Sequence, residues 1–305
     1  MAHLSVGVIE ALSNNTLGSF AKRTTGNSPE TTEFTFPEDQ IKAIQAGFTE
    51  VFNYTLREDL YATLPNPFAS ASSVDNDSKS PANLTLLDGS EGGQSLPLWT
   101  QIQPARNLDF IIAWDANEDA HPYSWANGTN LYNTYVSATN NSLPFPVVPP
   151  PATFINREYT TKPTFFGCEA NLTNTGDFSA PIVLYMPNAP YSAYTNYSWL
   201  QESFSHEQMS VVLTNSFNYV TQGNSTLDKE WPECLGCAVV DRTLTKVGME
   251  RTEQCQRCMT RYCWDGVEDN KNPGFVDIPL ILKPDLSFAK WNESVTSGFW
   301  PEIAK

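Results

Sequence analysis

Two almost uninterrupted apolar runs constrain the fold of this chain more than any other feature. They cover residues 110–114 (FIIAW) and 181–186 (PIVLYM). The first ends at a carboxylate, Asp115, and the second at Pro187. Strands of this composition are usually covered on both faces, as in a sheet that lies between helices. We therefore expect an α/β fold with a helix-flanked sheet.

Helical spacing of apolar residues is found on both sides of these runs. It predicts an amphipathic helix over residues 40–61, and further helices over 131–136 and 200–219. The apolar positions of the last helix are Phe204, Val211, Val212 and Phe217. A stretch rich in Ser, Asp and Asn at 69–82 is expected to be an exposed loop.

A single carboxylate, Asp88, stands between a strand-like segment and a glycine-rich turn. Residues 84–87 (LTLL) precede it, and three glycines follow within five positions. In open α/β sheets the carboxyl ends of the strands face the ligand crevice, so a carboxylate there can meet a substrate. Adjacent glycines let backbone approach without a Cβ clash. The alternative from local sequence is an ordinary Asp-Gly surface turn.

The charge balance excludes one class of function. The chain has 34 acidic and 18 basic residues among 305, for a formal net charge of −16. No basic patch stands out, so nucleic acid is not an expected partner. Anionic membranes would repel the chain, so any lipid that it handles needs local contacts. No run of eighteen apolar residues occurs in the sequence, and no transmembrane helix is expected.

The cysteine spacing allows two interpretations. Cys234-x-x-Cys237 is followed after seventeen residues by Cys255-x-x-Cys258, which lies within the range of zinc ribbons. Cys263 and Cys168 bring the total to an even six. In an oxidising compartment such thiols pair instead of holding metal, so a disulfide framework is favoured over zinc. The sequence leaves the pairing open.

Asparagine sequons are more frequent than this composition explains. Ten of the 25 asparagines begin Asn-x-Ser/Thr, where about four are expected by chance. They are Asn14, Asn53, Asn76, Asn83, Asn127, Asn140, Asn171, Asn196, Asn224 and Asn292. The surplus predicts a glycosylated chain that is secreted or associated with the cell wall. No signal peptide is visible at residues 1–30, so we expect a carboxyl-terminal piece of a secreted protein.

Two other catalytic arrangements find little support. Asp115, Glu118 and Asp119 resemble a carboxylate group of a glycosidase, but a solvated acidic loop is the simpler expectation. A Ser-His-Asp hydrolase needs a G-x-S-x-G elbow, and none occurs, although His121 and His206 follow Asp88. The sequence offers an acid–base residue without a visible nucleophile.

Several ordered blocks of sequence resemble the fungal lysophospholipase/phospholipase B family, which is related to the catalytic domain of cytosolic phospholipases. The match is clear between residues 84 and 266 and poor over 1–40. The blocks are residues 87–98 (LDGSEGGQSLPL), 104–115, 125–129, 162–168, 185–191, 231–238 and 262–264.

The resemblance implies an ester hydrolase with a Ser–Asp dyad, in which Asp88 takes the proton of the serine and later activates water. It requires no cofactor. The family's G-x-S-G-G nucleophile, oxyanion loop and phosphate-facing Arg would lie upstream and are not found here. Ser90 also stands where the family has Gly, and Gly92 where it has Asp. The chain alone is therefore expected to be inactive, with an N-terminal half supplied elsewhere.

The resemblance also gives an expected organisation. Residues 1–230 would form part of a lysophospholipase/patatin-like catalytic domain with a mixed sheet, 231–266 a cysteine-rich subdomain of it, and 267–305 an extension. The expected substrate is a lysophospholipid or phospholipid, met at a membrane or micelle surface. The alternative is a catalytically inactive, secreted lipid-binding or cell-wall glycoprotein on the same scaffold.

Overall fold

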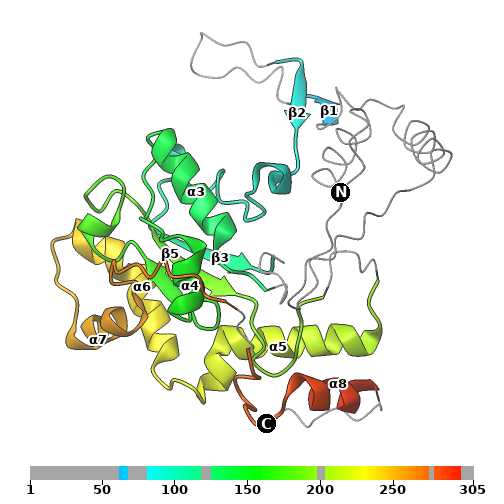
Figure 1. Cartoon of the computed structure of the whole chain (residues 1–305). Coiled ribbons are helices and arrows are strands. Elements are labelled where there is room, and N and C mark those ends of the chain that lie inside the picture. Colours follow the sequence, from blue (N-terminus) through cyan, green and yellow to red (C-terminus); the bar gives the residue numbers. More distant parts are fainter. Residues whose placement is uncertain (1–61, 68–80, 118–124, 198–202, 275–277, 297–305) are drawn as a thin grey trace, which may run out of the picture. The chain divides into compact units, whose positions relative to one another are not determined.

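The computed structural model describes residues 62–67, 81–117, 125–197, 203–274 and 278–296 (Figure 1). The chain divides into two units, residues 1–92 and 93–305. The expected helix over 40–61 lies outside the described residues, as does most of the expected loop over 69–82.

The first unit contains a two-stranded ribbon. Strand β1 (Ala62–Pro65) pairs antiparallel with β2 (Asn83–Leu86), and the 3-10 helix η1 (Gly89–Gly92) follows. The strand predicted before Asp88 is therefore present. Its described neighbour is antiparallel, so the expectation drawn from open parallel sheets does not apply to it. Leu64 and Leu86 of the ribbon are each 49% exposed, and Leu84 is half-buried.

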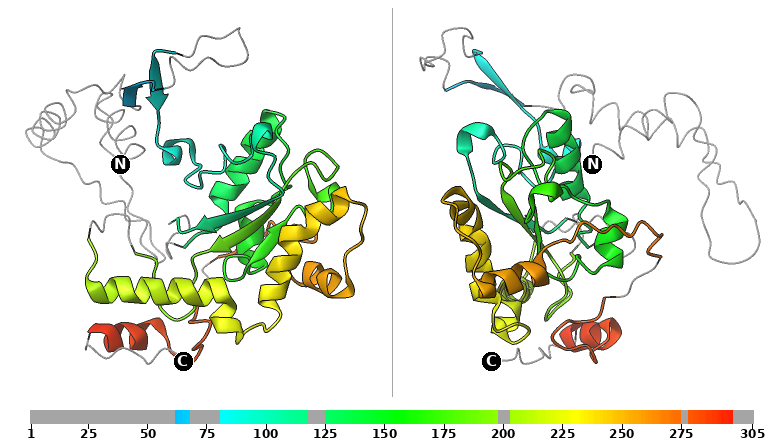
Figure 2. Two further views of the ribbon diagram at one scale, coloured as in Figure 1. Left: turned by 180° about the vertical axis from the view of Figure 1, so that it is seen from behind. Right: turned by 90° about the vertical axis from the view of Figure 1, so that its left-hand side faces the viewer.

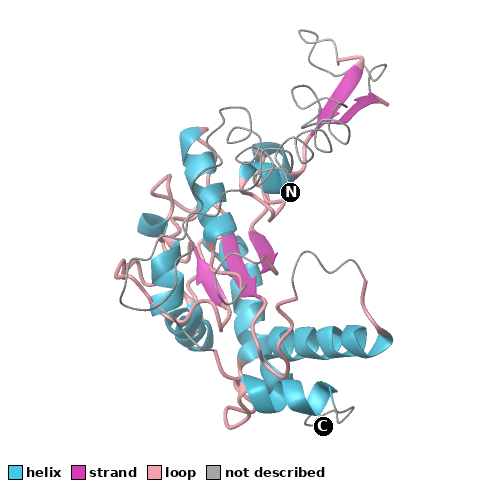
Figure 3. Cartoon of the chain, turned by 45° about the vertical axis from the view of Figure 1, so that its right-hand side comes forward, coloured by secondary structure: helices cyan, strands magenta, loops and turns pink. Residues whose placement is uncertain are grey.

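The second unit is built on a three-stranded mixed sheet. Strand β3 (Phe110–Asp115) runs parallel to the central strand β5 (Ile182–Pro187), and β4 (Thr164–Phe166) pairs antiparallel on the other side of β5. Helices cover both faces of this sheet (Figures 2 and 3). The expected α/β class with a mixed, helix-flanked sheet is confirmed.

Local capping signals explain where two of the helices begin. Ser205 and Gln208 form a capping box at the start of α5, with Gln208 N donating to Ser205 Oγ and Ser205 N to Gln208 Oε1. Thr252 Oγ1 accepts from Cys255 N at the start of α7. The helices are α3 (Thr129–Asn140), α4 (Pro151–Asn156), α5 (His206–Ser225), α6 (Trp231–Lys246), α7 (Glu253–Tyr262) and α8 (Phe288–Thr296), with 3-10 turns η2 (Pro104–Arg106) and η3 (Ala170–Leu172).

Each face of the sheet has its own hydrophobic core. On one face Leu184 and Met186 pack with residues of α5, α6 and α7. On the other, Val183 and Tyr185 pack with α3 and α4, where the Phe154 ring lies 5.1 Å from that of Tyr185. No described helix is long and apolar enough to span a lipid bilayer.

The two predicted buried strands differ in their burial. All six residues of β5 are buried, as predicted. In β3 burial alternates: Ile111 and Ala113 are buried, whereas Ile112 is 44% and Trp114 52% exposed. The prediction that both faces of residues 110–114 are covered is therefore wrong for β3. The reason is its position, because β3 is an outer strand of the described sheet and β5 is the central one.

Helix α5 is present, but its apolar positions are not all in the core. Val211 is buried, whereas Phe204 and Phe217 are 42% and 54% exposed. The buried face instead carries amides, with Asn215 fully buried. Asn215 Nδ2 donates to Ala189 O at 2.9 Å, and its Oδ1 accepts from the backbone of the same loop. The loop after β5 exposes backbone groups that need polar partners, so amides replace apolar residues there.

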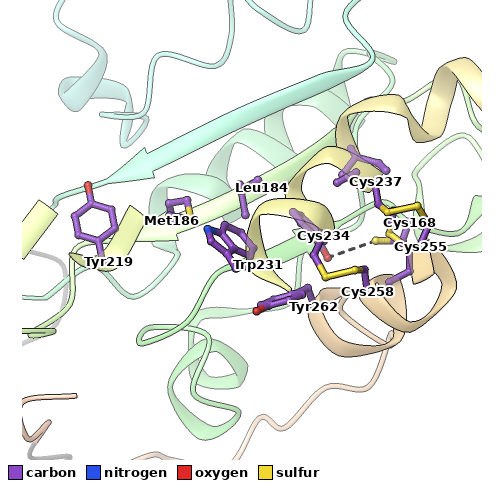
Figure 4. Packing of buried hydrophobic residues seen from close by; sticks show 14 of the residues in the cluster. Cys168, Leu184, Met186, Tyr219, Trp231, Cys234, Cys237, Cys255, Cys258 and Tyr262 are labelled. Carbon is purple, nitrogen blue, oxygen red and sulfur yellow. Dashed lines mark hydrogen bonds between the residues drawn. A yellow bond between two sulfur atoms is a disulfide. The ribbon is translucent and has the colours of Figure 1, made fainter. Parts of the chain in front are cut away.

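All six cysteines form disulfides. Cys234 pairs with Cys258 and Cys237 with Cys255, so two bridges join α6 to α7 (Figure 4). The third bridge joins Cys168, after β4, to Cys263, at the end of α7. The favoured disulfide framework is confirmed, and the pairing leaves no free thiol for the zinc alternative.

Candidate active site

Asp88 lies at the surface of the first unit, between β2 and η1. Its side chain is exposed. Oδ1 accepts two hydrogen bonds from Ser90, from the backbone N at 2.9 Å and from Oγ at 2.6 Å. The hydroxyl bond first, and the backbone bond second, hold the pKa of Asp88 below its ordinary value. Asp88 is therefore a carboxylate at neutral pH.

Ser90, which stands where the family has Gly, contacts Asp88 directly. It lies in the 3-10 helix η1, and its Oγ turns back to Asp88. A glycine at this position would offer only the backbone bond. The side chain of Ser90 thus adds a charge-assisted hydrogen bond that makes Asp88 a weaker base.

The end of the motif belongs to the second unit and is held by α3. Gly93 has a φ of +66°, and a Cβ there would lie 2.8 Å from Asn133 Nδ2. The same Nδ2 donates to Gly93 O at 2.7 Å, and Ser95 N donates to Asn130 Oδ1 at 2.8 Å. Glycine is required at position 93 by both the backbone conformation and the close amide.

Asp115 occupies a very different environment at the end of β3. The residue is 1% exposed. Tyr185 Oη donates to its Oδ2 at 2.9 Å, and Asn117 donates to Oδ1 through Nδ2 at 2.6 Å and N at 3.1 Å. Desolvation raises the pKa of Asp115, and the hydrogen bonds oppose this shift.

The expectation of a solvated acidic loop is wrong for Asp115. The direction of its side chain follows from the pleat of β3, which points residues 111, 113 and 115 to the core face. Glu118 and Asp119 lie outside the described residues, as does His121. His206 lies exposed at the beginning of α5.

A buried charge cluster around α6 was not predicted from the sequence. Arg242, 2% exposed, donates to the carbonyls of Gly167 and Ala180 and pairs with Asp241 at 3.0 Å. Arg251 pairs with the other oxygen of Asp241 at 2.6 Å. The Gly167 carbonyl lies next to Cys168, so the cluster joins α6 to the segment that the third disulfide holds. A single arginine in a helical segment is usually expected at the surface, so the burial of Arg242 could not be predicted from the sequence.

The described sequons differ in exposure. Asn127 and Asn196 are half-buried, and Asn127 Oδ1 accepts hydrogen bonds from Thr129 N and Oγ1. Asn14, Asn53 and Asn76 lie outside the described residues. The exposed sequons are Asn83, Asn140, Asn171, Asn224 and Asn292.

Among the side chains that the structure describes, no three His, Cys, Asp or Glu residues gather so that they could hold a metal ion. Asp88 belongs to the first unit and Asp115 to the second.

The chain is thus an α/β protein with three disulfides and an exposed carboxylate, Asp88, before a glycine-rich turn. The sequence profile of the lysophospholipase catalytic domain matches residues 3–269. The chain therefore belongs to the lysophospholipase catalytic-domain family, as the sequence blocks predicted.

Curated relatives agree with this assignment. The chain is 39% identical over 245 residues to Lysophospholipase 3 of Aspergillus fumigatus and 38% identical over 252 residues to Lysophospholipase 1 of the same species. It is 39% identical over 250 residues to Lysophospholipase 1 of Candida albicans. These matches cover 78%, 81% and 79% of this chain, but 38%, 38% and 40% of the relatives. No solved structure matches the chain.

Proposed function

We propose that this chain contributes the proton-accepting Asp of a lysophospholipase, which hydrolyses the fatty-acyl ester of lysophospholipids. The observation that carries the proposal is the family membership. The resemblance of residues 87–98 to the family's catalytic-Asp block supports Asp88 as the residue concerned. The ionised, exposed carboxylate of Asp88 is compatible with this role.

The reaction proceeds by acyl transfer. A serine hydroxyl attacks the ester carbonyl of the lysophospholipid, and Asp88 takes the hydroxyl proton. The glycerophospho alcohol then leaves as the acyl-enzyme forms. The proton on Asp88 goes to that alcohol. Asp88 then takes a proton from water as the water oxygen attacks the acyl-enzyme carbonyl. It gives that proton to the serine oxygen when the acyl–serine bond breaks and the fatty acid leaves.

The serine is the part that this sequence does not supply, because neither G-x-S-G-G nor G-x-S-x-G occurs in it. Loss of the nucleophile from a triad-type site lowers the rate by about six orders of magnitude. We propose that the chain alone has no measurable esterase activity, and that a patatin-like scaffold, secretion and glycosylation at the exposed sequons accompany the function.

A chimaera tests the proposal. This chain replaces the matching region of Aspergillus fumigatus Lysophospholipase 3, and fatty-acid release from lysophosphatidylcholine is measured. The chimaera is expected to be active, and Asp88→Asn to abolish the activity. Asp177→Asn is the matched control, because Asp177 is also exposed and accepts the same two bonds from Ser179. Retained activity in the Asp88→Asn chimaera would exclude Asp88 as the base.

The missing nucleophile favours one alternative, an inactive lipid-binding or cell-wall glycoprotein. Such a protein would bind lysophosphatidylcholine without any need for Asp88. Equal affinities of the native chain and Asp88→Ala, together with an inactive chimaera, would favour this alternative.

A further inference from the structure

The outer edge of β3 has the features of an interior strand. Within the described residues β3 has a neighbour, β5, on one side only. Its sequence, FIIAWD, contains neither Lys nor Pro, and its one charged side chain, Asp115, points inward to Tyr185. Natural edge strands are usually protected by charged side chains, outward or inward, by prolines or by bulges, and in β3 only Asp115 at its end is of this kind.

The side chains beside this edge are also incompletely covered. Ile112 and Trp114 point to the face that α5 and α6 cover at β5, yet they are 44% and 52% exposed. The Trp114 ring packs edge-on against Tyr219 of α5, with 6.3 Å between the ring centroids. Strands that pair in parallel are normally buried on both faces. The exposed apolar side chains of β3 are therefore better suited to contact with another protein segment than to contact with solvent.

The relatives indicate what that layer is. The chain covers 38–40% of the curated relatives, whereas those matches cover 78–81% of the chain. More than half of each relative therefore has no counterpart in this sequence. Within the described residues the sheet has three strands, fewer than the usual four to six.

We propose that the open edge of β3, with Ile112 and Trp114, binds the part of a lysophospholipase catalytic domain that precedes the region matched here. That part adds a strand beside β3 through backbone hydrogen bonds and covers the two side chains. The bound segment would also carry the serine of the proposed function, and its identification rests on that function.

The test is co-expression of two separate polypeptides in a secretory host. One is this chain with an affinity tag, and the other is the segment of Aspergillus fumigatus Lysophospholipase 3 that precedes its matched region. We expect the two to purify together in a 1:1 ratio. Ile112→Lys and Trp114→Lys should each lower the recovered partner at least tenfold.

Val247→Lys is the matched control. Val247 is also an exposed apolar residue, 63%, but it follows α6 and lies outside the sheet. It should leave the complex unchanged. All variants are first checked for three disulfides by mass, so that a misfolded chain is not counted. The readout is binding and not activity, and Asp88→Asn should bind the partner as the native chain does. The absence of a complex would therefore contradict this proposal without bearing on Asp88 as the base.

Four results would overturn the proposal. The first is that no complex forms. The second is a complex that Ile112→Lys and Trp114→Lys do not weaken. The third is a dimer of this chain alone that these substitutions abolish, which would make a second copy the occupant. The fourth is full protection of the amides of residues 110–115 from hydrogen exchange in the isolated chain, which would mean that its own residues cover the edge.

Discussion

The hydroxyl of Tyr185 donates to the buried carboxylate of Asp115, with 2.9 Å between Oη and Oδ2. The two residues lie on neighbouring parallel strands, β5 and β3, and both side chains point to the face that α3 and α4 cover. A carboxylate at 1% exposure needs such donors, because burial alone disfavours its charged form.

Replacing Tyr185 by Phe should destabilise the protein by about 2 kcal/mol at pH 7, the usual range for a hydrogen bond to a charged group. The ring and its packing on Phe154 remain. Tyr159→Phe is the control, because that ring also packs on Phe154, whereas the donors to Asp115 are Tyr185 and Asn117. Urea denaturation measures both. Equal losses in the two variants would assign the effect to packing.

The same pair predicts a pH dependence. Burial raises the pKa of Asp115, so the folded state holds the proton more tightly than the unfolded state. This stabilising contribution is complete below the ordinary value of 3.8 and is lost as the pH rises through the higher folded value. Asp115→Asn should therefore reduce the change in unfolding free energy between pH 4 and pH 7. An unchanged difference would show that Asp115 titrates normally.

Ser90→Gly should make Asp88 a stronger base. The Ser90 hydroxyl is the largest cause of the lowered pKa of Asp88, so its removal should raise that pKa toward 3.8. Titration of the Asp88 carboxyl carbon by NMR measures the shift. Ser179→Gly removes the equivalent hydroxyl from Asp177 and should leave Asp88 unchanged. A pKa of Asp88 that stays the same in Ser90→Gly would contradict the observed bond.

Arg242→Met should cost about 3 kcal/mol of stability, since it leaves the buried Asp241 with one partner fewer and two carbonyls without a donor. Arg257→Met should cost at most about 0.5 kcal/mol, because Arg257 is 57% exposed and its ion pair with Glu230 spans 3.5 Å. Thermal unfolding compares the two. Similar values would show that the cluster around α6 contributes little.

The disulfides should differ in their contribution. Cys168–Cys263 closes a sequence separation of 95 residues and Cys237–Cys255 one of 18. Loop-closure entropy then predicts that losing the first bridge costs about 1.5 kcal/mol more. The double variants C168S/C263S and C237S/C255S test this by chemical denaturation. A larger loss in the second pair would mean that native-state packing outweighs chain entropy.

Elements with a local signal could be predicted from the amino-acid sequence. The run at residues 181–186 became the buried strand β5, residues 131–136 lie within α3, and the cysteine count and sequons favoured disulfides over zinc. The ordered blocks gave the family. Each of these depends on composition or spacing over a short window, which does not change with the rest of the fold.

Which surfaces are buried could be seen only in the folded chain. Asp115 was expected in solvent and lies in the core, whereas Ile112 was expected in the core and is exposed. Phe217 was expected to face the core, but Asn215 does so, because the loop after β5 needs amide donors and acceptors. The pairing of the cysteines was likewise set by how α6 lies against α7. Burial depends on neighbours that are distant in sequence, and no local pattern reports them.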